Sequence, residues 1–125
     1  MEIDKHIILS MFHILLIVPF FLYIGYQRGA TPQWVYMATF VIGAIIGIYH
    51  GYKFVIRVLT RSEYAWINAI HFILVAPLLL YIGYHKKNTP RFAYELLLML
   101  GFAAGGYHLF SLVKLLDVHY ESALE

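Results

Sequence analysis

Cysteine is absent from the 125 residues of this chain, and charged residues are scarce. The absence of cysteine excludes disulfides, thiolate metal sites and thiol-based catalysis. Charged residues make up 13 % and apolar residues 62 %, against about 25 % and about 45–50 % in soluble domains. The formal net charge is only +2 and no basic patch stands out, so nucleic acid is not an expected partner. The composition indicates a lipid bilayer as the surroundings of the chain.

The apolar residues gather in four stretches, each close to the 20 residues that a membrane-crossing helix needs. They run from about 7 to 26, 33 to 58, 64 to 84 and 92 to 116. Because the connections are short, neighbouring helices should run antiparallel. We therefore predict an all-α, multi-pass integral membrane protein. Residues 1–125 form one transmembrane domain, an up-down-up-down bundle of four helices with both termini on the same side.

The orientation of this bundle is weakly determined by the basic residues that flank the spans. The side that holds both termini has five of them and the other side has four, so the positive-inside rule favours cytoplasmic termini by a small margin. The five are Lys5, Lys53, Arg57, Arg61 and Lys114, and the four are Arg28, Lys86, Lys87 and Arg91.

An internal repeat runs through the chain at a spacing of 58 residues. HILLIVPFFLYIGY begins at His13, and HFILVAPLLLYIGY begins at His71. Aligned without gaps, residues 11–53 and 69–111 share 15 identities in 43 positions, including histidine, proline, glycine and tyrosine. We interpret the chain as a duplicated helical hairpin, with repeats over about 7–58 and 64–116. Because each repeat holds two spans, the pseudo-twofold axis should lie along the membrane normal.

Each predicted helix carries one histidine at a similar depth. His13 and His71 follow the starts of the first and third spans by about six residues, and His50 and His108 precede the ends of the second and fourth by about eight. At 1.5 Å per residue, all four lie roughly 9–12 Å inside the span ends. The sequence therefore predicts a layer of four imidazoles.

Small residues indicate which helix faces point inward. Gly43 and Gly47 share a helical face with His50, and Gly101 and Gly105 share one with His108. A small residue repeated four positions on lets two membrane helices approach closely. We expect His13 and His71 to face the inside of the bundle as well, because an unpaired imidazole N–H in lipid costs about 2 kcal/mol or more.

We consider a bound redox cofactor the leading interpretation of this layer. Neutral imidazole is a common ligand of haem iron and of transition metals, and helical bundles build such sites from inward side chains. Two of the four histidines would ligate a haem b for electron transfer or sensing, or all four would hold one transition-metal ion. The absence of carboxylates from the layer argues against calcium, magnesium and carboxylate-bridged iron.

Two other interpretations stay open. The histidines and nearby polar residues can form a pathway for protons or ions, with a pore between the protomers of a homo-oligomer. Alternatively, the histidines only order the helices. An enzyme is not favoured, since no serine has a triad-like setting. The candidate pathway or cofactor-supporting residues are Tyr23, Tyr36, Tyr49, Tyr81, Tyr94, Tyr107 and Lys53.

Overall fold

Four apolar helical spans make up the computed structural model, which describes residues 4–125. They cover Lys5–Ala30, Gln33–Leu59, Ala65–Asn88 and Arg91–Leu124, and by length and composition each can cross a membrane. The prediction of an all-helical chain with four such spans is confirmed. The last helix continues to Leu124, past the predicted end near residue 116, so the polar tail is helical as well.

The first and third spans are built from the same series of helical segments. The first contains α1 (Lys5–Phe12), the π-helical turn η1 (His13–Ile17), α2 (Val18–Gln27) and the 3-10 turn η2 (Arg28–Ala30). The third contains α4 (Ala65–Ile70), the π-helical turn η3 (His71–Val75), α5 (Ala76–His85) and the 3-10 turn η4 (Lys86–Asn88). In both spans, a histidine is therefore the first residue of a π-helical turn.

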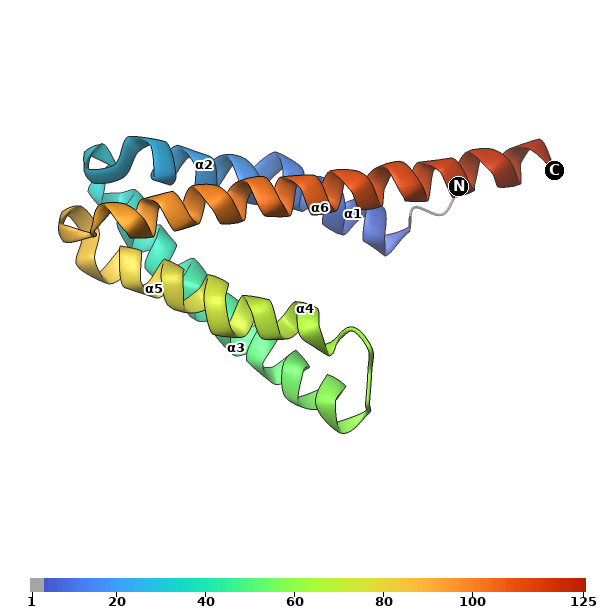
Figure 1. Cartoon of the computed structure of the whole chain (residues 1–125), viewed down its shortest axis with the longest axis horizontal. Helices are drawn as coiled ribbons and strands as arrows, with labels where there is room; N and C mark the ends of the chain where they lie inside the picture. Colours follow the sequence, from blue (N-terminus) through green and yellow to red (C-terminus); the bar gives the residue numbers. More distant parts are fainter. Residues whose placement is uncertain (1–3) are drawn as a thin grey trace. The chain divides into compact units, whose positions relative to one another are not determined.

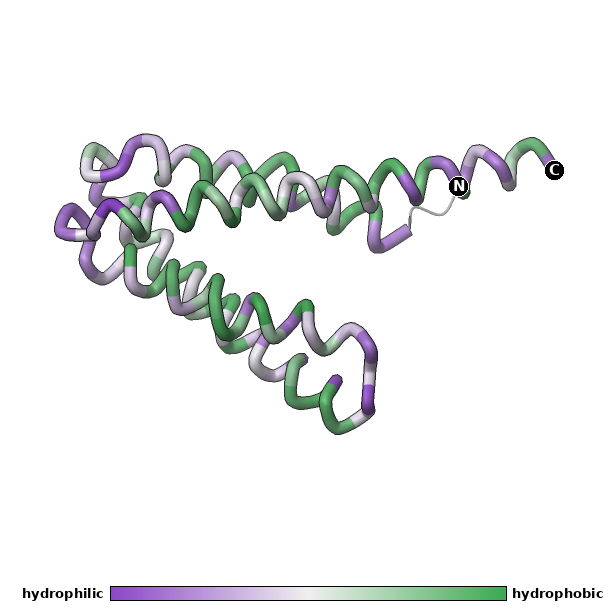
Figure 2. The backbone as a smooth tube through the Cα atoms, viewed as in Figure 1, coloured by the Kyte–Doolittle hydropathy of each residue, from purple (hydrophilic) through white to green (hydrophobic). Residues whose placement is uncertain are grey.

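The second and fourth spans are uninterrupted helices, α3 (Gln33–Leu59) and α6 (Arg91–Leu124). Pro32 has extended backbone and caps the start of α3, and Pro90 stands directly before α6. Proline suits these positions because a helix start needs no N–H from it. Apolar residues lie along the helices, and hydrophilic residues gather at the turns between them (Figure 2).

The chain divides into two compact units (Figure 1). Unit 1 contains the first span up to Tyr26 together with α6 from Glu95 onward. Unit 2 consists of residues 27–94, in which α3 runs alongside α4, η3 and α5. Each unit is thus a pair of long helices, and each pair joins a helix with a π-helical turn to an uninterrupted one.

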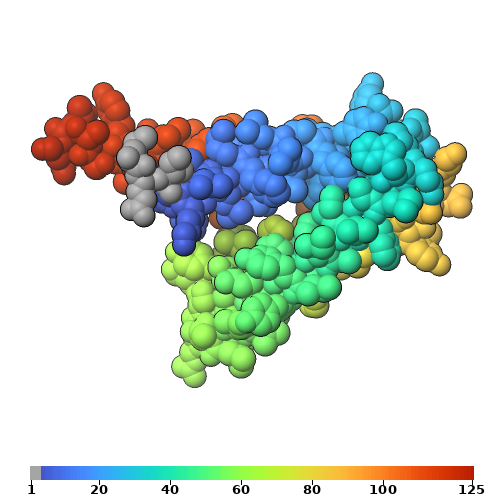
Figure 3. All heavy atoms as spheres, turned by 180° about the vertical axis from the view of Figure 1, so that it is seen from behind, coloured from blue at the N-terminus to red at the C-terminus, as the bar shows by residue number. Residues whose placement is uncertain are grey.

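Glycine lets the two helices of unit 2 approach closely. A Cβ atom on Gly43 of α3 would lie 3.0 Å from both Leu79 Cβ and Leu80 N of α5. A Cβ atom on Gly83 of α5 would lie only 2.6 Å from Phe40 N of α3. Figure 3 shows the side chains of α3 as a continuous surface along this unit. The sequence analysis did not assign Gly83 to helix packing.

In unit 1, α6 meets α2 through the glycines at the corresponding positions. A Cβ atom on Gly101 would lie 3.0 Å from Leu22 Cδ2. One on Gly105 would lie 3.5 Å from Val18 Cγ1, an ordinary contact distance. Of the glycines predicted to pack helices, Gly43 and Gly101 therefore have tighter surroundings than Gly105 and Gly47, whose Cβ would lie 3.4 Å from Ala76 Cβ.

Each π-helical turn ends two residues before a proline. The N–H of Val18 donates to the His13 carbonyl, and the N–H of Ala76 donates to the His71 carbonyl, each spanning five residues. Pro19 and Pro77 follow, and each lacks the N–H of a regular helix and crowds the carbonyl four residues earlier. The wider turn accommodates this crowding. Proline is among the residues that the two repeats share, but the π-helical turns were not predicted.

The closest approach in unit 2 gives a stability prediction. Gly83→Ala places a methyl group against the backbone of Phe40, so we expect a loss of about 1–3 kcal/mol, the usual cost of overpacking. Thermal unfolding in detergent, followed by circular dichroism, measures it. Gly106→Ala is the matched control, because its Cβ would meet nothing within 4 Å and alanine favours helix. Equal melting temperatures for the two variants would contradict the packing described here.

Candidate functional site: two stacked histidine pairs

The four histidines predicted to share a layer form two stacked pairs, one in each unit. In unit 1, the rings of His13 and His108 have centroids 4.2 Å apart and an interplanar angle of 20°. In unit 2, the rings of His50 and His71 have centroids 4.2 Å apart and an angle of 14°. Both pairs join a histidine at the start of a π-helical turn to one on an uninterrupted helix.

Each histidine that begins a π-helical turn hydrogen bonds within its own helix. His13 Nδ1 lies 2.8 Å from the Leu9 carbonyl oxygen, and His71 Nδ1 lies 2.7 Å from that of Ile67. A carbonyl oxygen only accepts, so Nδ1 carries the proton in both rings. In the neutral form, Nε2 then holds the lone pair. This is the tautomer of a histidine that binds a metal through Nε2.

His50 differs from His13 and His71, because its Nδ1 accepts a hydrogen bond. The donor belongs to a chain of polar side chains in unit 2. Arg57 Nη1 donates to Asn68 Oδ1 at 2.6 Å. The amide nitrogen of Asn68 lies 2.9 Å from His50 Nδ1. Because Arg57 has only donors, it fixes which end of the amide faces it. The Asn68 N–H therefore donates to His50 Nδ1, and a neutral His50 carries its proton on Nε2.

Asn68 is the site residue that the sequence analysis missed. Its side chain is 3 % exposed, and it comes three residues before His71 in the third span. An uncharged polar residue one helical turn from a histidine was the available signal. The corresponding position in unit 1 is Ser10, which is also 3 % exposed. Leu115 stands in unit 1 where Arg57 stands in unit 2.

Tyrosine side chains flank both pairs. The Tyr49 ring meets His50 edge-on with centroids 5.1 Å apart, and the Tyr107 ring meets His108 in the same way at 5.2 Å. Each of these tyrosines precedes its histidine in the sequence and is largely exposed. They add aromatic surface beside the imidazoles. Lys53, one turn beyond His50, is half-buried.

Tyr36 and Tyr94 lie far along the helices from the histidines and bind each other. Their hydroxyl oxygens are 2.6 Å apart in unit 2. The Tyr36 hydroxyl also lies 2.7 Å from the Arg28 carbonyl oxygen, and the Tyr94 hydroxyl 3.1 Å from that of Lys86. Arg28 and Lys86 both have positive φ angles, 51° and 50°. The two tyrosines therefore tie two strained turns together.

The remaining tyrosines of the predicted pathway lie apart from the pairs. Tyr23 is exposed, and Tyr81 packs against His85 with ring centroids 4.2 Å apart. Tyr49 and Tyr107 each have a ring contact with a paired histidine. The pathway through the tyrosines stays a prediction.

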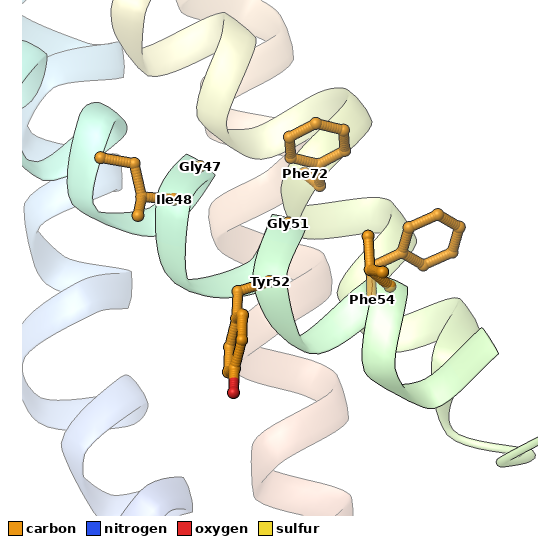
Figure 4. Close-up of a pocket in the computed structure, with 7 residues that line it drawn as sticks. Gly47, Ile48, Gly51, Tyr52, Phe54 and Phe72 are labelled. Carbon is orange, nitrogen blue, oxygen red and sulfur yellow. The ribbon is translucent and has the colours of Figure 1, made fainter. Parts of the chain in front are cut away.

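A shallow apolar groove of about 600 Å³ runs along unit 2, and neither His50 nor His71 lines it. Gly51 and Phe72, the residues that follow the two histidines, lie together in it (Figure 4). A Cβ atom on Gly51 would lie 2.9 Å from Phe72 Cε2, so the Phe72 ring packs directly against this glycine. The groove is also lined by Gly47, Ile48, Tyr52, Phe54 and Val55.

Within residues 4–125, no three histidine, aspartate or glutamate side chains converge as a site for a metal ion. The expectation that four imidazoles hold one bare ion is therefore without support from this geometry. Comparison of the chain with protein-family models, with curated proteins and with solved structures finds no match. Function must be argued from the two pairs themselves.

The tyrosine contact predicts a role in stability. Tyr94→Phe removes the hydroxyl that meets Tyr36 and the Lys86 carbonyl, and we expect it to lower the free energy of unfolding by about 1 kcal/mol. Tyr26→Phe, at a largely exposed ring, should have little effect. Denaturant titration of both variants in detergent measures the difference. A Tyr94→Phe protein as stable as Tyr26→Phe would show that the contact contributes nothing.

Proposed function

We propose that this chain is a multi-pass membrane protein that binds haem b through its paired histidines, for electron transfer or sensing. The observation that carries the proposal is the repeated arrangement of His13 and His71. In each unit, a π-helical turn and a carbonyl hydrogen bond hold one imidazole with Nδ1 protonated and Nε2 as the ligand nitrogen. Ligating histidines usually donate their second ring nitrogen to a carbonyl or carboxylate in this way.

The stacking decides which histidines serve as ligands. The rings within each pair are stacked 4.2 Å apart, so no flat macrocycle fits between them. A pair therefore supplies at most one ligand to one iron. His13 and His71 have the suitable tautomer, so each unit offers one ligand nitrogen, while His50 and His108 support those rings by stacking.

The apolar groove of unit 2 has aromatic and glycine residues along it, although neither histidine lines it. A bound haem iron would supply one-electron chemistry or a coordination position for a small molecule. The protein residues hold the ligand tautomer, shield the imidazoles from water and keep the π-helical turn in place.

We also propose that the two hairpins arose by duplication and enter the membrane from the same side. The matching ring distances of the two histidine pairs support this, as do the matching tyrosine–carbonyl contacts at Arg28 and Lys86. The same relationship would place both termini on one side of the bilayer, for which the basic residues favour the cytoplasm.

The side of entry can be measured because the chain lacks cysteine. Single cysteines introduced as Gly29→Cys and Lys87→Cys lie in the two exposed turns η2 and η4. We expect a membrane-impermeant thiol reagent to label both from the same side of sealed vesicles. Labelling from opposite sides would rule out the parallel arrangement.

Haem binding has a direct test. The protein, purified in detergent after expression with a haem precursor, should show a Soret band and stoichiometric iron. His13→Phe and His71→Phe keep a ring for stacking but remove the ligand nitrogen. We therefore expect each variant to lose the haem bound by its own unit. His85→Phe is the matched control, since His85 Nδ1 also bonds the carbonyl four residues earlier, at 3.0 Å, outside the pairs. A colourless, iron-free wild-type protein would refute the proposal.

Proton conduction is the second candidate, and the Arg57–Asn68–His50 chain favours it. Hydrogen bonds run from the guanidinium to the imidazole, which stacks on a second imidazole. If the protein binds no haem, proton flux into liposomes distinguishes the remaining functions. Flux abolished by His71→Phe and retained in His85→Phe would support conduction. Loss of thermal stability without flux would indicate that the histidines serve only to order the helices.

A further inference from the structure

The two histidine pairs have the same ring geometry but different polar neighbours. In unit 2, the buried Asn68 stands beside the pair and is held by Arg57. In unit 1, the corresponding positions are occupied by Ser10 and Leu115. A hydroxyl can rotate to donate or to accept, whereas an amide fixed at one end presents only donors at the other. Unit 2 therefore specifies the protonation of its histidines more strictly.

We propose that Asn68, held by Arg57, is a positioning residue that makes the two histidines of unit 2 chemically distinct. It assigns the Nε2–H tautomer to His50, while the Ile67 carbonyl assigns the Nδ1–H tautomer to His71. His71 is then the iron ligand of unit 2, and His50 is a hydrogen-bond donor stacked on it. The assignment of His71 as iron ligand rests on the proposed function, whereas the assignment of the two tautomers does not depend on it.

The geometry leaves few alternatives for the amide. Its oxygen is 2.6 Å from Arg57 Nη1, a short contact typical of a charge-assisted bond. Turning the amide around would place its N–H₂ group against the guanidinium and its oxygen against His50. The bond to Arg57 would then be lost inside a site where Asn68 is 3 % exposed. An unmade bond to a charged group costs more there than at the surface.

The tautomers can be read without any cofactor. In cofactor-free protein with ¹⁵N-labelled histidine, at alkaline pH where imidazoles are neutral, nitrogen chemical shifts distinguish protonated from unprotonated ring nitrogens. We expect His50 to be unprotonated at Nδ1 and His71 to be protonated there. The single variants His50→Phe and His71→Phe assign the two sets of signals. The same tautomer on both histidines would overturn the proposal.

Asn68→Asp tests the cause of the difference. Aspartate has nearly the same shape and still accepts from Arg57, but it offers no donor to His50. We expect His50 to reverse its tautomer and His71 to keep its own. Arg57→Leu, which introduces the residue of unit 1, releases the amide, so His50 should show both tautomers. An unchanged His50 spectrum in Asn68→Asp would show that Asn68 does not set the tautomer.

Titration of the cofactor-free protein with ferric protoporphyrin tests the ligand assignment separately. We expect His50→Phe to keep binding in unit 2 and His71→Phe to lose it. If His50→Phe loses haem while His71→Phe keeps it, the assignment is wrong but the haem proposal stands. If no variant and no wild-type protein binds haem, the haem proposal fails, and with it the ligand assignment, while the nitrogen spectra still decide the role of Asn68.

Discussion

Every polar group within an apolar span must find a partner inside the protein, because lipid offers none. The histidines of this chain satisfy that constraint in two ways. His13 and His71 bond carbonyl oxygens of their own helices, four residues back, and His50 bonds a side chain of the neighbouring helix. The stacking of the rings follows from these bonds, since they leave the flat faces of the imidazoles to meet each other.

The π-helical turns and the histidines depend on the same local feature. A proline six residues after His13 and after His71 removes an N–H from the helix and crowds an earlier carbonyl. The backbone accommodates this with a helical turn that is one residue wider. Such turns often mark functional positions in helices. Here they begin at the residue whose Nδ1 is tied to the preceding helical turn, so backbone and side chain together orient the ring.

Different contacts hold the helices of unit 2 together at different depths. Close backbone approach at Gly43 and Gly83 joins the middle of α3 and α5. The Tyr36–Tyr94 pair joins the turns η2 and η4 at one end of the unit, and the Arg57–Asn68–His50 chain joins α3 to α4 at the other end. These are the kinds of contact, tight packing and internal hydrogen bonds, by which helices associate in lipid, where no hydrophobic force acts between them.

Length and composition were enough to predict the helical class and the four spans, because these depend only on local chain geometry and hydropathy. Which histidine faces which was decided by tertiary structure: His13 pairs with His108 of the last span, and His50 pairs with His71 of the next span. The role of Asn68 was likewise invisible, because a single amide has no sequence pattern and its donor direction is set by Arg57 on another helix. The repeat predicts equivalent positions, but the different chemistry of the two pairs arises from the neighbours that each ring meets after folding.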